Sequence, residues 1–156
     1  MGTMKLRSLL NDVSAKYMYR LSYLANNYRD PFLREVERIH GLTRPELTIL
    51  FCLAQRDGIN AKDVADLTRQ PKNTLSRGAE ILEKKGLITR RTDQRDRRRS
   101  MMLITQEGMR LYDHMLALYE EAEQRMLTPL DEKDLADLDR VFGKMCNFIA
   151  EQNGNH

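Results

Sequence analysis

The chain has 156 residues, the size of one ordinary domain, and its 41% apolar content excludes a disordered protein. No apolar run approaches the ~20 residues of a membrane helix, and the amino terminus lacks the apolar core of a secretory signal, so we expect a cytoplasmic protein with no membrane partner. The net charge of +3 predicts no partner by itself. Its distribution is more informative, because residues 69–99 contain eleven Lys or Arg against four Asp or Glu.

The amino-terminal segment has the periodicity of a helix that packs on another helix. Apolar side chains recur in steps of three and four, which predicts one amphipathic helix from Leu6 to about Tyr28. The Asp30-Pro31 pair then marks either a break or the start of a second helical segment that runs to Ile39. His40-Gly41 ends this region.

Two helix starts follow in the middle of the chain. Thr43 is placed to cap a helix while Glu46 reaches back to it, and this helix is apolar around most of its circumference, so we expect it at the centre of the core. Asn60 and Asp63 form a second cap, opening a short helix. Residues 68–70 link that helix to the next one, which is the pattern of a helix-turn-helix.

The next helix opens at Pro71, and Leu75, Ala79 and Leu82 fall on one of its faces. Gly86 suits the left-handed position past its end. Residues 87–89 and 101–104 are apolar enough to pair as two short strands, and residues 90–99 between them form a loop dense in arginine. Because arginine is almost never buried unpaired, this loop must face solvent or a negatively charged partner. A basic helix followed by a basic hairpin favours a polyanion and a winged helix.

Two long helices close the chain. Thr105 is placed to cap a helix that runs through Met126, and Asp131 caps a last helix whose apolar stripe extends to Ile149. The terminal helices carry more apolar surface than a small winged-helix core can cover, so we expect a homodimer in which the ends of two chains intertwine. The predicted fold is mainly α with a small β-hairpin (α+β). It is a single domain, residues 1–156, with dimerisation helices at 5–40 and 106–153 and a winged helix-turn-helix DNA-binding lobe at 43–105.

Several segments together resemble the MarR (multiple antibiotic resistance regulator) family of bacterial transcription factors. They read Asp63-Val64-Ala65-Asp66-Leu67, Asn73-Thr74-Leu75-Ser76-Arg77, Leu82-Glu83-Lys84-Lys85-Gly86-Leu87-Ile88-Thr89-Arg90, Asp93-Gln94-Arg95-Asp96-Arg97-Arg98 and Leu103-Ile104-Thr105-Gln106-Glu107-Gly108. The resemblance covers the whole chain and is most specific in the segment that begins at Asp93. It implies a homodimeric winged helix-turn-helix repressor that binds a palindromic operator in double-stranded DNA and is released by a small ligand. Gly78, inside the second helix of the motif, departs from the family pattern, and either allows a close backbone approach or is merely tolerated.

The expected DNA contacts divide by chemistry. Arg77 suits guanine and Asn73 suits adenine in the major groove, and Lys72 is better placed for phosphate. At the wing tip Arg95 and Arg97 are expected to enter the minor groove, while Asp93 or Asp96 pairs with Arg98 to hold the loop. Arg90, Arg91 and Arg99 either bind phosphate or are merely solvated. The full set of expected DNA-binding residues is Lys72, Asn73, Thr74, Ser76, Arg77, Arg95, Arg97 and Arg98.

An effector site in such a fold would lie between the dimerisation helices and the DNA-binding lobe. Aromatic walls with a few arginines suit an aromatic acid or its coenzyme A thioester. The candidate residues are Tyr17, Tyr19, Arg20, Tyr23 and Arg29. The alternative for each is that the tyrosine only packs and the arginine is only solvated.

Other kinds of site find little support in the sequence. No nucleophile elbow, phosphate loop or paired-carboxylate motif is present, so we expect no catalytic residues and no cofactor. The histidines and the two cysteines, Cys52 and Cys146, lack metal-ligand spacing, so we expect no metal. The rival hypothesis for function is a helical protein-interaction module whose basic hairpin binds an acidic partner.

Overall fold

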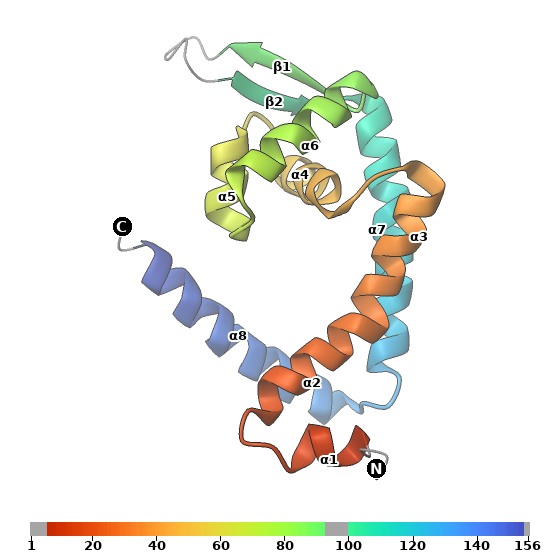
Figure 1. Ribbon diagram of the computed structural model, residues 1–156, viewed down its shortest axis with the longest axis vertical. Helices are drawn as coiled ribbons and strands as arrows, with labels where there is room; N and C mark the ends of the chain where they lie inside the picture. Colours follow the sequence, from red (N-terminus) through yellow and green to blue (C-terminus); the bar gives the residue numbers. More distant parts are fainter. Residues whose placement is uncertain (1–5, 93–99, 155–156) are drawn as a thin grey trace, which may run out of the picture. The chain divides into compact units, whose positions relative to one another are not determined.

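A computed structural model describes residues 6–92 and 100–154, with side chains described to residue 152 (Figure 1). The elements, in chain order, are α1 Leu6–Asn11, α2 Lys16–Leu24, the π-helical turn η1 Ala25–Arg29, α3 Asp30–His40, α4 Arg44–Gln55, α5 Ala61–Thr68, α6 Lys72–Lys84, β1 Ile88–Thr92, β2 Ser100–Ile104, α7 Gln106–Leu127 and α8 Glu132–Gly154. The predicted class is confirmed: the fold is mainly helical, with one small antiparallel hairpin. The chain divides into two compact units, Met1–Glu120 and Glu121–His156.

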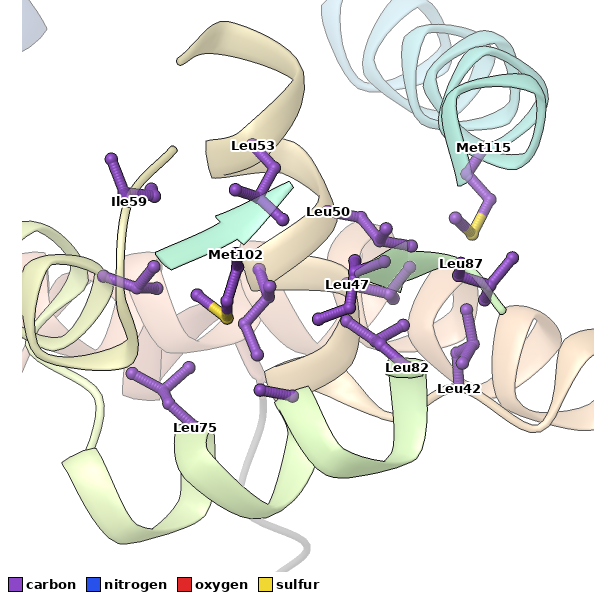
Figure 2. Close-up of a cluster of buried hydrophobic side chains, with 14 of the residues drawn as sticks. Leu42, Leu47, Leu50, Leu53, Ile59, Leu75, Leu82, Leu87, Met102 and Met115 are labelled. Carbon is purple, nitrogen blue, oxygen red and sulfur yellow. The ribbon is translucent and has the colours of Figure 1, made fainter. Parts of the chain in front are cut away.

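The core of the first unit forms around α4, as its apolar sequence predicted. Leu47, Ile49, Leu50 and Leu53 of this helix are almost completely buried. They meet apolar side chains from the end of α3, from α5 and α6, from the hairpin and from α7, and Figure 2 shows Leu75, Leu82, Met102 and Met115 pointing into the same cluster. Because α6 and the hairpin both pack against the core around α4, this packing holds them in a fixed arrangement.

Side chains start the helices where the sequence placed them. Glu46 reaches back to accept the Thr43 backbone N–H at 2.6 Å, and the Thr43 side chain accepts from the backbone N–H of Glu46, which completes the predicted capping box. Asn60 Oδ1 accepts from the backbone N–H groups of Lys62 and Asp63, at 2.9 and 3.0 Å. These caps satisfy N–H groups that a helix start leaves without partners.

The single helix predicted from Leu6 to Tyr28 is wrong. The chain bends at residues 12–15, between α1 and α2. The bend is held by side chains whose role periodicity does not reveal: Ser8 donates to Asp12, and the Arg20 guanidinium donates to Leu10 O at 2.9 Å and to Asn11 Oδ1 at 2.7 Å. Arg20 thereby provides hydrogen-bond donors for the Leu10 carbonyl and the Asn11 side-chain oxygen at the end of α1.

The Asp30-Pro31 pair begins α3, which was one of the two sequence alternatives, and the helix does not break there. The π-helical turn η1 leads directly into α3. Proline cannot donate to the carbonyl four residues before it and its ring clashes there, so the wider π turn lets the helix continue through Pro31.

The hairpin is longer than predicted. Ile88 pairs with Ile104, Arg90 with Met102 and Thr92 with Ser100, so Arg90 and Arg91 belong to β1 and are not in the loop. Residues 93–99 lie outside the described part of the chain. The hairpin is also tied to the loop before α5: Ile104 N donates to Asp57 Oδ1 at 2.8 Å, and Met102 N donates to Ile59 O at 2.8 Å.

The start of α7 is packed closely against the start of β1. Thr105 N donates to Leu87 O at 3.0 Å, and the Thr105 hydroxyl donates to Gly86 O while accepting from Gly108 N, which confirms the predicted cap. A Cβ on Gly108 would lie 2.1 Å from Leu87 O, so only glycine fits without a backbone shift. Gly86 has φ +70°, as its predicted left-handed position requires.

The second unit contains the end of α7 and α8. Asp131 caps α8 as predicted, by accepting from Asp134 N at 2.8 Å. Ala122 is buried, whereas the other described side chains of this unit are intermediate or exposed, and Phe148 and Ile149 are more than half exposed. None of the helices in the described residues is both long and apolar enough to cross a bilayer.

Candidate nucleic-acid interface

The second helix of the helix-turn-helix, α6, is buried along one face and open along another. Leu75, Ala79 and Leu82 face the core, and all three are essentially inaccessible to solvent. The polar residues Asn73, Thr74 and Arg77 are exposed on the open side. The predicted base-reading residues are therefore available to a large partner, with the exception of Ser76, which is half-buried.

The turn between α5 and α6 is short and fixed. Arg69 ends α5 in a left-handed conformation with φ +59°, which is uncommon for a residue with a side chain. Gln70 Nε2 donates to Thr48 Oγ1 at 2.6 Å, which ties the turn to α4. The relative orientation of the two helices thus depends on α4, which lies beneath both.

Gly78 brings α6 close to the start of α4. A Cβ at this position would lie 3.3 Å from Glu46 Oε1 and 3.3 Å from Pro45 Cβ, tighter than ordinary contact. The same Glu46 carboxylate, 3% exposed, caps α4. This supports the first of the two readings of Gly78, a close backbone approach.

A small cavity lies between the start of α5, α6 and the hairpin. Its volume is about 270 Å³, and we name it the basic crevice after Lys62, Lys72 and Arg90 among its lining residues. Ser76 also lines it. Lys72 and Ser76 therefore border the hairpin, whereas Asn73 and Arg77 lie on the exposed side of α6.

Arg90 lies on the inward face of the hairpin. It pairs in register with the buried Met102, and its Nε lies 3.2 Å from Glu83 Oε2 on α6. Arg91, the next residue along β1, is exposed. The sequence left both arginines as either phosphate contacts or solvated residues, and the structure separates them: Arg90 is part of the contact between α6 and the hairpin.

The wing-tip residues fall outside the described part of the chain. Arg95, Arg97 and Arg98 belong to this group, together with Asp93 and Asp96, which were expected to hold the loop. Their roles stay predictions.

A second and larger cavity is formed by α3, α4, α5 and α7. Its volume is about 940 Å³, and we name it the aromatic cavity after Phe32, Phe51 and Tyr119, which line it. The ring centroids of Phe32 and Tyr119 are 4.7 Å apart, and those of Phe51 and Tyr119 are 6.1 Å apart. Arg29 and Asp63 also contribute to the lining, so its charge is mixed.

The structure brings one of the five expected effector residues to this cavity. Arg29 lines it, with its guanidinium 2.8 Å from the carboxylate of Asp30. Arg20 is occupied at the end of α1, and Tyr17, Tyr19 and Tyr23 are exposed along α2. Phe51 lies on α4, the helix that the sequence placed at the centre of the core, and no local pattern indicates that it would share a cavity with residues 32 and 119.

The cysteines lie in ordinary surroundings. Cys52 is half-buried beside the aromatic cavity, and burial raises the pKa of its thiol, so the reactive thiolate is disfavoured at neutral pH. Cys146 is exposed on α8.

Comparison with known proteins identifies the fold and gives a family match for the DNA-binding segment. Residues 40–99 match the model of the MarR family. Over 126 residues the chain is 24% identical to the HTH-type transcriptional repressor MdtR of Bacillus subtilis, covering 81% of each chain. It superposes on a MarR protein from Peptoclostridium difficile with a TM-score of 0.83, at 14% identity and covering 99% of both chains. It also superposes on a MarR transcriptional regulator from Methanosarcina mazei with a TM-score of 0.78, at 21% identity and covering 86% of this chain and 96% of the other.

The matched segment begins at the end of α3 and includes the whole helix-turn-helix and β1, which is where the geometry above is concentrated. Regulators of this family bind DNA and function as dimers. Residues 40–99 therefore resemble the MarR family in sequence, and the structure has the winged helix-turn-helix fold of the solved regulators.

Proposed function

We propose that the protein is a homodimeric repressor that acts in the cytoplasm on a palindromic operator, with one α6 in the major groove of each half-site. The observation that carries this is the exposed set Asn73, Thr74 and Arg77 on a helix whose opposite face is locked into the core. A helix held in this way presents short polar side chains to base edges without losing its own packing. The two half-sites would be centred about 34 Å apart, one turn of the duplex.

Repression is proposed because the similar Bacillus subtilis protein MdtR is described as a transcriptional repressor. The direct test places a reporter gene behind the promoter region nearest to this gene, with and without the protein. Repression requires lower reporter output when the protein is present. Higher output would make the protein an activator and overturn this part of the proposal.

Base reading is tested with Arg77→Ala. A duplex that the protein selects from a random pool is compared with an unrelated duplex of equal length by fluorescence anisotropy. Loss of a bidentate arginine–guanine pair costs about 1–3 kcal/mol of discrimination, so the variant should lose affinity for the selected duplex and keep its weaker affinity for the other. The matched control is Lys133→Ala, which removes one positive charge from α8. An equal loss on both duplexes would remove Arg77 from base reading.

The wing is proposed to enter the minor groove through Arg95 and Arg97, with Arg98 holding the loop. Arg97→Ala should weaken binding and reduce its dependence on salt concentration, because each arginine placed against the backbone or in a groove displaces counterions. Unchanged affinity together with an unchanged salt slope would remove the wing from the mechanism.

The effector is proposed to be an aromatic acid, or its coenzyme A thioester, bound in the aromatic cavity. The rings of Phe32, Phe51 and Tyr119 would stack on an aromatic group, and the guanidinium of Arg29 would exchange Asp30 for the ligand carboxylate. This places the site on α3, α4 and α7, and leaves Tyr17, Tyr19 and Tyr23 free for another surface.

Calorimetric titration with benzoate and phenylacetate derivatives and their thioesters tests this site. Tyr119→Ala should abolish binding, while Tyr17→Ala, which removes an exposed ring from α2, should leave it unchanged. A true effector must also lower operator affinity by the same factor by which the operator lowers effector affinity. Binding that survives Tyr119→Ala, or that leaves operator affinity unaltered, would overturn the assignment.

A further inference from the structure

The basic crevice joins three separate parts of the DNA-binding lobe. Lys62 comes from the first turn of α5, Lys72 and Ser76 come from the first turns of α6, and Arg90 comes from the inward face of β1. Among the described residues that line it, three carry a positive charge and none carries a carboxylate. Arg90 has a carboxylate partner outside this lining, Glu83, and the positive charge that remains in the crevice would attract an anion.

Arg90 is the strongest sign that an acceptor belongs in this crevice. Its Nη2 is shielded from solvent and has no hydrogen-bond partner among the described residues. Leaving a buried donor unsatisfied is costly, and most such groups in folded proteins have a partner. Glu83 holds the guanidinium from the Nε side, at 3.2 Å, so the planar group has a defined orientation.

The other groups lining the crevice suit a phosphate oxygen. In the described part of the chain, Lys62 and Lys72 form no ion pair and the Ser76 hydroxyl makes no hydrogen bond. The amino-terminal end of α5 adds a positive partial charge, although the Asn60 cap already takes two of its N–H groups. Two ammonium groups, one hydroxyl and one guanidinium can together surround a tetrahedral oxyanion.

The position of the crevice identifies the source of the phosphate. Lys72 directly precedes Asn73, so the crevice adjoins the exposed side of α6. A helix that enters the major groove is flanked by the two sugar-phosphate backbones. A phosphate in the crevice would therefore be one that borders the bases read by α6.

We propose that the basic crevice binds one backbone phosphate of each half-site, with Lys62 and Arg90 as DNA-binding residues that fix how deeply and at what angle α6 enters the groove. This proposal rests on the DNA-binding function above. It adds Lys62, which the sequence did not assign, and selects phosphate binding for Arg90 from the two alternatives that the sequence left open. Arg90 contacts both α6, through Glu83, and the phosphate, so it keeps the helix and the hairpin in one arrangement on the duplex.

The first test measures the salt dependence of binding for Lys62→Gln, Arg90→Gln and the charge-matched control Lys133→Gln on the selected and unrelated duplexes. Because phosphate contacts carry no sequence information, both crevice variants should weaken both duplexes by the same factor. Each lost contact should lower the slope of log affinity against log salt concentration by about 0.9 per half-site. Lys62 is exposed, so its variant should fold normally even if Arg90→Gln does not.

The second test uses the ion pair with Glu83. Glu83→Gln keeps an amide oxygen that can still orient the guanidinium but removes the negative charge that competes with phosphate. It should therefore tighten DNA binding, and the gain should vanish when Arg90→Gln is also present. If Arg90 only supports the hairpin, Glu83→Gln will leave affinity unchanged or reduce it. A gain that persists in the double variant would reflect net charge alone and would also contradict the proposal.

The third test locates the phosphate. Duplexes with a single neutral methylphosphonate at successive positions should show one position per half-site that weakens the wild-type protein but leaves Lys62→Gln unaffected. Identical profiles for the two proteins would overturn the proposal. Inorganic phosphate is also tested as a competitor at matched ionic strength. If this competition needs Lys62 while no methylphosphonate position depends on Lys62, the crevice binds a free anion and the proposal is overturned. Failure of the wild-type protein to bind any duplex would instead overturn the DNA-binding function itself.

Discussion

The winged-helix lobe buries its apolar residues, whereas the terminal helices leave many of theirs exposed. In the lobe, Leu50, Leu75 and Met102 are completely or almost completely buried. In α1, α2 and η1 no residue is buried, and on α8 Phe148 is 63% exposed. Both regions have helical apolar stripes in the sequence, so the stripe alone does not say what covers it. The lobe is complete within one chain, whereas the terminal helices have apolar surface to offer a second copy.

The largest effect is expected for a substitution in the buried core of the lobe. Leu50→Ala removes a fully buried side chain at the centre of α4 and should lower the free energy of unfolding by about 2–5 kcal/mol. Urea denaturation monitored by circular dichroism measures this. Leu67→Ala is the matched control, because the same side chain on α5 is 71% exposed and its truncation should cost little. Equal losses would show that the lobe is not the packed region described here.

A substitution on the terminal helices should weaken dimer association without changing the fold of the lobe. Phe148→Asp places a charge on the exposed apolar face of α8 and should weaken the dimer by roughly 2 kcal/mol or more, as expected at an interface hot spot. Analytical ultracentrifugation over a range of concentrations measures the dissociation constant. Glu151→Gln on the same helix is the control. A dimer as tight as that of the wild type would exclude this face from the interface.

A smaller effect is expected where the lobe meets α7. Gly108→Ala brings a methyl group within 2.1 Å of Leu87 O, so the backbone must shift, at a cost of about 1–3 kcal/mol. Gly143→Ala on α8 meets nothing within 4 Å and should be neutral or slightly stabilising. The difference between the two thermal midpoints is the measurement. If both substitutions behave alike, the close approach at Gly108 is absent in solution.

The smallest effect concerns pH. Burial, and then electrostatic interactions with His114 and Lys85, hold the pKa of His40 below its ordinary value of 6.5. The unfolded chain therefore binds a proton more readily than the folded one, so stability should be unchanged above about pH 6.5 and fall as the pH drops below it. Denaturation at several pH values measures this, and His40→Gln should flatten the curve. An equally steep fall in the variant would assign the effect to other groups.

Local signals predicted the lobe well and the terminal helices less well. The caps at Glu46, Asn60, Thr105 and Asp131 were found because a cap depends on residues within one turn of each other. The bend after α1 was missed because it depends on Arg20, which lies nine and ten residues from its two acceptors. The apolar residues keep their helical spacing through the bend, so periodicity does not reveal it.

The interface was predictable to the same extent. The exposed side of α6 follows from its buried stripe, so the exposure of Asn73 and Arg77 was predictable from spacing alone, and their contact with DNA stays a prediction. The inward placement of Arg90 was not, because it depends on the hairpin register, which pairs it with Met102. The aromatic cavity was missed for a similar reason, since Phe32, Phe51 and Tyr119 meet only in the folded chain.

The π-helical turn η1 also determines the direction in which the side chains of α2 point. A π turn contains one more residue than the α-helical turn it replaces, and one residue corresponds to about 100° of rotation around a helix axis. The side chains of α2 are therefore rotated by that angle from where an uninterrupted α-helix leading into α3 would place them. Deletion of Asn26 combined with Pro31→Ala, which removes the ring that the wider turn accommodates, would restore the regular phase. It would rotate Tyr17, Tyr19 and Tyr23 about the helix axis while leaving α3 and the lobe in place. One inserted residue thus sets which side chains the amino-terminal helix presents to its surroundings.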